Sequence, residues 1–201
     1  QKPLYPGRMA HNYLPRHFNA YAKEKKILNG SAGNPNLEKI AQLLKNEDYK
    51  HAVFSGEEFE RSTPQAVKKV MQKFMLPHVD EHTVICYVRP HAARILSSFA
   101  ENSKIGYFGG TLTEFHQRSS TKGRLRYVDV LAPWIAAFGN HFTARPFVRD
   151  VLVNGSALKD FTHYAFPESE VRVQEIKAAN ESLSLEDLVF VRYMQQQLAR
   201  R

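Results

Sequence analysis

TVICYVRPHAARILSS, residues 83–98, is the stretch around which this chain is organised. It opens with an apolar run of mostly β-branched and aromatic residues, 84–88, which is typical of a strand covered on both faces in a parallel sheet. Pro90 follows, and proline is tolerated at the first position of a helix because its missing N–H would have no partner there. Apolar residues then recur at helical spacing. The stretch therefore predicts a strand, a charged corner at Arg89 and a helix.

The corner at Arg89 is a candidate ligand site, because ligands bind at the carboxyl ends of strands in open α/β sheets. A guanidinium is a planar fork of donors that can bind a phosphate in two places at once. Ser97, eight residues further on, offers a hydroxyl from the predicted helix. The alternative is that Arg89 is a solvated residue at the start of a helix and that Ser97 is a small packing residue.

Further elements are predicted along the chain. HAVFS, residues 51–55, is a second short apolar run and is predicted to be a parallel core strand, and HFTARPF, residues 141–147, is predicted to be another strand. Capping residues and apolar residues at helical spacing predict helices over residues 35–46, 64–74, 111–115, 127–138 and 185–198. The last helix is expected to pack on the sheet.

This order of strands and helices indicates crossover units, and therefore an α/β fold with a parallel sheet. A chain of 201 residues is long enough for one such domain with a sizeable core and too short for two comfortable ones. We therefore expect a single domain over residues 1–201.

The composition is ordinary for a soluble protein, with 43% hydrophobic and 24% charged residues, but the net charge of +8 is not. A basic excess of this size suits an anionic partner such as a nucleotide, an acidic glycan, nucleic acid or a membrane surface. The single cysteine, Cys86, excludes a disulfide framework. No apolar run long enough to span a membrane and no secretory signal is visible, so a cytoplasmic location is expected.

A basic turn, SSTKGRLR at residues 119–126, precedes the predicted helix over residues 127–138. It carries Lys122, Gly123 and Arg124. A charge run of this kind is more often a solvated loop than a site. The turn is followed by the pattern Tyr-x3-Leu-x2-Trp-x3-Phe, and the combination of the two favours a site, because it resembles a segment of a known family, as follows.

The segment from Arg89 to Ser97 and this basic turn resemble sulfotransferases that use 3′-phosphoadenosine 5′-phosphosulfate (PAPS), in particular bacterial sulfotransferase-like proteins related to glycan sulfotransferases. The resemblance implies a three-layer, P-loop NTPase-like fold whose central, mainly parallel sheet is flanked by helices. It implies that Arg89 and Ser97 hold the 3′-phosphate of the nucleotide, and that Lys122, Gly123 and Arg124 lie near the nucleotide and the acceptor. A short helix over residues 157–161 also matches the family.

The N-terminal part departs from the family's pattern. In the family, a segment similar to LYPG, residues 4–7 here, follows a first strand, a phosphosulfate loop with glycine and threonine, and a first helix. No such loop precedes LYPG in this sequence. The expectation is a sulfotransferase-like domain that lacks these three elements, and that in this form binds the nucleotide weakly and turns over poorly.

The activity that the resemblance implies is transfer of a sulfuryl group from PAPS to a hydroxyl or amine of a carbohydrate or small-molecule acceptor. A general base must take the acceptor's proton. Glu57 and Glu58 are candidates because they follow the predicted strand at residues 51–55, where cytosolic family members carry a catalytic histidine. His11 is a further candidate because a histidine titrates near neutral pH. The alternative for both glutamates is a solvated approach to a helix.

Other classes of function are weaker interpretations. A relative that keeps the sheet for binding and has lost the chemistry is suggested by the missing loop. A basic nucleic-acid-binding domain is suggested by the charge, but no helix combines a basic face with exposed aromatic residues and no such motif is present. The nine histidines are scattered without metal-ligand spacing, so PAPS is the expected cofactor and no metal is expected.

Overall fold

The computed structural model describes residues 14–23, 37–46, 50–169, 171 and 184–198. The chain divides into two compact units. The first unit comprises Gln1–Val84 and Pro133–Phe142, and the second comprises Ile85–Ala132 and Thr143–Arg201.

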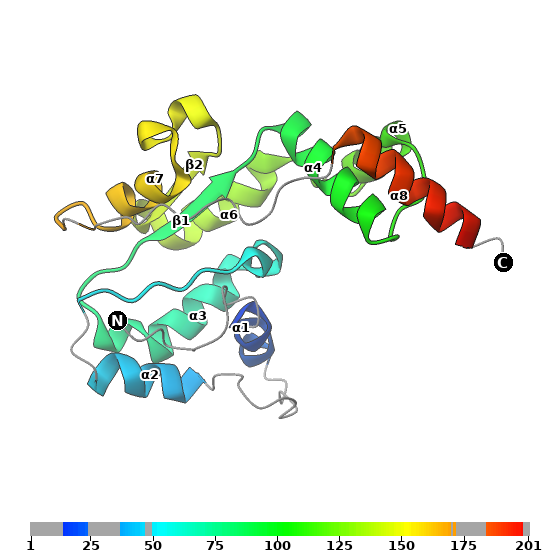
Figure 1. Ribbon diagram of the computed structural model, residues 1–201. Helices are drawn as coiled ribbons and strands as arrows, with labels where there is room; N and C mark the ends of the chain where they lie inside the picture. Colours follow the sequence, from blue (N-terminus) through cyan, green and yellow to red (C-terminus); the bar gives the residue numbers. More distant parts are fainter. Residues whose placement is uncertain (1–13, 24–36, 47–49, 170, 172–183, 199–201) are drawn as a thin grey trace. The chain divides into compact units, whose positions relative to one another are not determined.

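The first unit is helical in the part that the structure describes (Figure 1). Its elements are α1 (Leu14–Ala22), α2 (Leu37–Asn46), the 3-10 turn η1 (Glu57–Arg61), α3 (Pro64–Phe74) and the 3-10 turn η2 (Leu76–His78). The start of α3 is as predicted: the Thr63 side chain accepts a hydrogen bond of 3.2 Å from the backbone N–H of Ala66, and Pro64 is the first helical residue.

An apolar core joins α1, α2 and α3 in this unit. Phe18 from α1, Ile40 from α2 and Val70 from α3 are each at most 2% exposed. The core also receives Phe138, the last residue of α6 (Tyr127–Phe138). Gly139 follows with a φ of +55°, a conformation that favours glycine, and α6 ends there as its sequence predicts.

The sheet consists of two parallel strands, β1 (Val84–Val88) and β2 (Phe142–Pro146). Both strands are where the sequence predicts them. The 3-10 turns η3 (Gly139–His141), η4 (Arg149–Val151) and η5 (Val153–Gly155) lie on either side of β2 along the chain, and α7 (Ala157–Ala165) follows them. This helix covers and extends the short helix that the resemblance implies.

Three helices of the second unit, α4 (His91–Lys104), α5 (Leu112–Thr121) and α8 (Leu185–Leu198), pack together (Figure 1). Their contact is made by Ile95, Phe99, Phe115 and Leu188, all at most 9% exposed. The start of α5 is the capping box that the sequence predicts, with the side chain of Thr111 and the carboxylate of Glu114 each bonded to the other's backbone N–H.

Five details of the prediction are wrong. The helix predicted over residues 111–115 runs to Thr121, so residues 119–121 of the predicted basic turn are helical. Residues 51–55 form no strand, because they pair with no neighbouring strand; only Phe54 among them reaches the core. The residues of β1 are partly exposed rather than covered on both faces. Pro90 caps α4 and is not its first helical residue. The last helix, α8, packs on α4 and not on the sheet.

The architecture is therefore α/β and mostly helical, with a small parallel sheet. The larger three-layer, P-loop-like arrangement is not confirmed, because the described residues hold a sheet of two strands. Within the same residues, no helix is both long enough and apolar enough to span a bilayer.

Candidate functional site

Arg89 and Ser97 lie together at the carboxyl end of β1. The Arg89 Nη1 donates a hydrogen bond of 2.7 Å to the Ser97 Oγ, and both residues are exposed. The contact forms because α4 begins two residues after Arg89, so that its second turn brings Ser97 back beside the arginine. Since the serine oxygen accepts this bond, its own hydrogen remains able to donate to a ligand.

The remaining surroundings of Arg89 leave it able to bind an anion. Its guanidinium lies over the ring of Phe147, 5.5 Å from the ring centroid. Its backbone carbonyl accepts a hydrogen bond of 2.7 Å from the hydroxyl of Tyr127. No carboxylate within the described part of the chain forms an ion pair with Arg89. A guanidinium has five N–H donors and only one is used by Ser97, so donors remain for a phosphate.

The basic turn is joined to this corner by two contacts. The His91 Nε2 donates a hydrogen bond of 2.8 Å to the backbone carbonyl of Leu125, in the turn. The His91 ring stacks on the ring of Tyr127, the residue that follows the turn, with centroids 4.3 Å apart. These contacts place Leu125 and Tyr127 against His91, the first residue of α4.

The cations of the turn differ in what they contact. Lys122 and Arg124 are exposed, and Gly123 between them has a φ of +67°. Arg126 forms an ion pair with Asp129 at 2.6 Å. Lys122 and Arg124 are therefore better placed than Arg126 to meet a second anionic group of a ligand.

A buried ion pair supports the strand that carries Arg89. Asp160 in α7 is 0% exposed, and its carboxylate accepts hydrogen bonds from Arg145, from the backbone of Val153 and from the hydroxyl of Tyr87. The bond from the Arg145 Nη2 is 2.6 Å long and the bond from the Tyr87 Oη is 2.7 Å long. The Arg145 guanidinium contributes most to lowering the pKa of Asp160 to about 2. Burial and then the bond to Asp160 raise the pKa of Tyr87.

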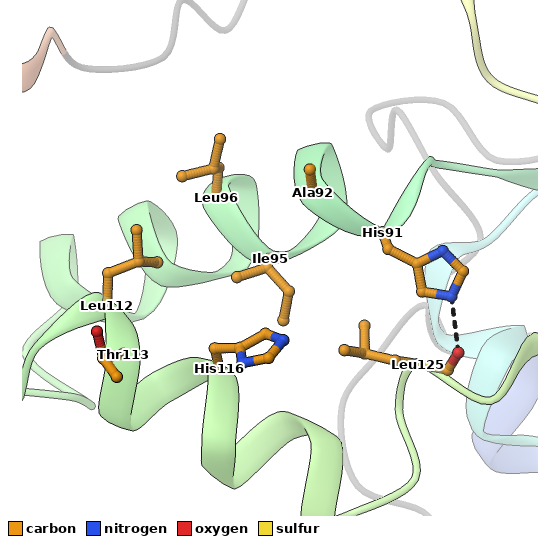
Figure 2. A pocket seen from close by; sticks show the side chains of 8 residues that line it. All are labelled: His91, Ala92, Ile95, Leu96, Leu112, Thr113, His116 and Leu125. Atoms are coloured by element: carbon orange, nitrogen blue, oxygen red, sulfur yellow. Dashed lines mark hydrogen bonds between the residues drawn. The ribbon is translucent and has the colours of Figure 1, made fainter.

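A groove of about 480 Å³ lies between α4 and α5 (Figure 2). Its lining is mostly aliphatic, with the imidazoles of His91 and His116. Ile95 lines it, whereas Ser97, two positions further along α4, does not. Positions two apart on a helix point to nearly opposite sides, so the groove is on the side of α4 away from the Arg89 and Ser97 contact.

The two candidate acids lie in η1 and not at the end of a strand, because the predicted strand before them does not form. Glu58 accepts two hydrogen bonds from Arg16, of 3.0 and 3.1 Å. These bonds lower the pKa of Glu58 and make it a weaker base. Glu57 is exposed. His11 lies outside the described residues.

Comparisons of the chain with protein-family models, with curated proteins and with solved structures found no match. In the described part of the chain, no group of three or more histidine, cysteine, aspartate or glutamate side chains is arranged to hold a metal ion.

Sequence reasoning missed two residues of this site. Phe147 closes the predicted strand HFTARPF, but nothing in the sequence says that β2 pairs with β1 so as to bring it to Arg89. The sequence places Tyr127 on the apolar face of a helix and in the pattern that carries the resemblance, but it does not predict that the Tyr127 hydroxyl bonds to the backbone of Arg89. An available signal was that a tyrosine standing where phenylalanine would pack equally well often has a hydrogen-bond partner.

Proposed function

We propose that this chain is a PAPS-dependent sulfotransferase that binds the 3′-phosphate of the nucleotide with Arg89 and Ser97. The observation that carries the proposal is the 2.7 Å hydrogen bond between these two side chains at the carboxyl end of β1. The P-loop-like architecture that accompanies this activity in the family is part of the same proposal.

The chemistry of the corner suits a phosphate monoester. A guanidinium binds two phosphate oxygens in its own plane, and a serine hydroxyl can donate to a third. The basic turn, which contacts His91 through Leu125, adds the exposed cations Lys122 and Arg124, and the net charge of +8 favours an anionic ligand over long distances. A nucleotide that carries two separate phosphate groups would use both parts of this surface.

The proposed reaction is an in-line displacement at sulfur. The acceptor's oxygen or nitrogen attacks the sulfur atom, the bond from sulfur to the 5′-phosphate oxygen breaks, and adenosine 3′,5′-bisphosphate leaves. A general base takes the acceptor's proton. Of the three candidates, Glu58 is disfavoured because its ion pair with Arg16 lowers its pKa. Glu57 and His11 remain, and Glu57 is our first choice for mutation.

Thermal unfolding of the whole chain with adenosine 3′,5′-bisphosphate tests the binding step. A ligand at about ten times its Kd stabilises the folded state by about 1.4 kcal/mol. For a chain of this size that raises the Tm by about 3–6 °C. We expect a rise in wild type, a much smaller rise with adenosine 5′-monophosphate, and no rise in Arg89→Ala. Arg118→Ala, which removes an exposed arginine from α5, is the matched control and should respond as wild type does.

Transfer of labelled sulfate from PAPS to a panel of glycans and small hydroxylated acceptors tests the chemical step. Transfer that depends on Arg89 supports the enzyme. Binding without transfer to any acceptor favours the non-catalytic relative instead. No Tm change with adenosine 3′,5′-bisphosphate, together with a rise on adding duplex DNA, favours a nucleic-acid-binding domain and contradicts the proposal.

A further inference from the structure

We propose that Phe147 is a positioning residue that holds the Arg89 guanidinium ready for the 3′-phosphate and so sets the preference of the site for nucleotides that carry this group. The inference rests on the proposed function. It adds Phe147, the residue after β2, to a site that the sequence assigns to the end of β1 and to α4.

The pairing of β1 and β2 fixes where the Phe147 ring lies. The backbone N–H of Phe147 donates a hydrogen bond of 2.8 Å to the carbonyl of Val88, the residue before Arg89. The ring therefore lies beside Arg89 through a backbone contact and does not depend on a flexible loop. Its centroid is 5.5 Å from the guanidinium carbon of Arg89, which is within the range of a cation–π interaction.

The Phe147 ring also packs against a second aromatic ring, that of Tyr87. The Tyr87 ring packs against it edge to face, with centroids 6.1 Å apart and an angle of 85° between the ring planes. The Tyr87 hydroxyl in turn donates to the buried carboxylate of Asp160. A series of contacts thus runs from a buried ion pair, through two aromatic rings, to the exposed guanidinium of Arg89.

Phe147 and Ser97 restrain Arg89 in different ways. Ser97 accepts a hydrogen bond from Nη1, on one edge of the guanidinium, while the Phe147 ring lies against the guanidinium carbon. A phosphate can bond to the N–H groups that Ser97 does not use, so it can bind while the guanidinium stays over the ring. Because a long arginine side chain is ordered before the ligand arrives, less rotamer freedom is lost on binding.

The competing explanation is that Phe147 only packs on Tyr87. It is 38% exposed and adjoins the sheet, so a packing role alone is reasonable. The two explanations differ in what a substitution does. Loss of packing would lower the stability of the protein or its affinity for all ligands alike. Loss of the Arg89 orientation would lower the affinity only for ligands with a 3′-phosphate.

The test is calorimetric titration of the whole chain with adenosine 3′,5′-bisphosphate and with adenosine 5′-monophosphate. The measured quantity is the Kd for adenosine 5′-monophosphate divided by the Kd for adenosine 3′,5′-bisphosphate. We expect Phe147→Leu to reduce this ratio about two- to fivefold, the size of an exposed cation–π contact. Phe147→Tyr keeps an aromatic face and should keep the wild-type ratio. Phe190→Leu is the matched control, since Phe190 is an exposed phenylalanine of α8 in the same unit.

Each outcome separates this inference from the proposed function. If wild type does not bind adenosine 3′,5′-bisphosphate, the proposed function fails. If wild type prefers the 3′-phosphate and Phe147→Leu has the same ratio, or weakens both ligands equally, the function stands and the positioning role is wrong. Phe147→Met, which also lacks an aromatic face, provides the same comparison if Phe147→Leu does not fold.

Discussion

The Tyr127 hydroxyl donates a hydrogen bond of 2.7 Å to the backbone carbonyl of Arg89, 38 residues earlier in the chain. This bond connects the first residue of α6 to the corner after β1. The His91 ring stacks on the same tyrosine, so the corner, the start of α4 and the end of the basic turn meet at one aromatic residue. Tyr127 thereby connects the two segments on which the functional proposal depends.

Tyr127→Phe should lower the free energy of unfolding by about 0.5–1.5 kcal/mol, the usual net value of one hydrogen bond. The ring and its stacking on His91 remain, so only the bond to Arg89 is lost. Urea denaturation measures the change. Tyr107→Phe is the control, because Tyr107 is 77% exposed and should tolerate the substitution. Equal stability of the two variants would mean that the Tyr127 bond contributes nothing.

Asp160→Ala should destabilise the protein by about 3–5 kcal/mol, because it leaves the Arg145 guanidinium without the partner of a buried ion pair. Asp129→Ala is the comparison, since its ion pair with Arg126 is exposed and such pairs contribute about 0–1 kcal/mol. Denaturant unfolding of both variants checks the difference. Similar losses in the two would show that the Asp160 pair is no stronger than a surface pair.

The lowered pKa of Asp160 predicts a loss of stability in acid. The carboxyl has a pKa of about 2 in the folded chain and 3.8 in its ordinary state. The unfolded chain therefore takes up the proton first as the pH falls, and unfolding becomes more favourable. The contribution of Asp160 is complete above pH 3.8 and disappears as the pH falls to about 2. Asp160→Asn should have a lower Tm than wild type near neutral pH, and its Tm should fall less between pH 3.8 and about 2. Parallel curves of Tm against pH for the two proteins would show that Asp160 is not the source of the acid sensitivity.

Gly110→Ala should destabilise the start of α5, whereas Gly109→Ala should not. A Cβ on Gly110 would lie 2.5 Å from the Glu114 Oε2 and 2.8 Å from the Phe108 Cζ, but a Cβ on Gly109 meets nothing within 4 Å. The Glu114 carboxylate would have to leave the capping box, and the loss of its hydrogen bond to the backbone of Thr111 costs about 0.5–1.5 kcal/mol. Thermal unfolding of the two neighbouring variants compares them directly. The reverse order of stability would contradict the described geometry.

Glu57→Gln should reduce sulfuryl transfer about 10²- to 10⁴-fold without changing nucleotide affinity, as expected for loss of a general base. Glu58→Gln should have a much smaller effect, because Glu58 is already engaged by Arg16. Steady-state rates and calorimetric Kd values of both variants separate chemistry from binding. If neither variant slows transfer, both glutamates are excluded and His11 becomes the candidate to mutate.

The sequence predicts the elements of this chain better than their pairing. Residues 84–88 and 51–55 are both short apolar runs, yet only the first becomes a strand, because only it is paired with residues 142–146. An apolar run reports burial or β-propensity but does not name a partner. For the same reason the sequence does not show which apolar residues of α8 are buried. Leu188 is buried, whereas Val189 is 60% exposed.

The candidate site was predictable where it is local in the chain. Arg89 and Ser97 meet because a helix begins between them, which the residues around Pro90 indicate. The part that sequence reasoning missed depends on tertiary contacts: Phe147 reaches Arg89 through strand pairing, and Tyr127 reaches it across 38 residues. A single sequence can indicate that a side chain such as Tyr127 has a partner, but it does not say which residue the partner is.

The most direct test of the account is a double-mutant cycle on the affinity for adenosine 3′,5′-bisphosphate. Calorimetry on wild type, Arg89→Ala, Ser97→Ala and the double variant gives four Kd values. A bond to a charged group is worth about 1.5–3 kcal/mol, so we predict that Arg89→Ala weakens binding at least about tenfold. Because the two side chains act on one phosphate, the double variant should lose less than the product of the single effects. An Arg89→Ala protein that binds the nucleotide as tightly as wild type would contradict the account.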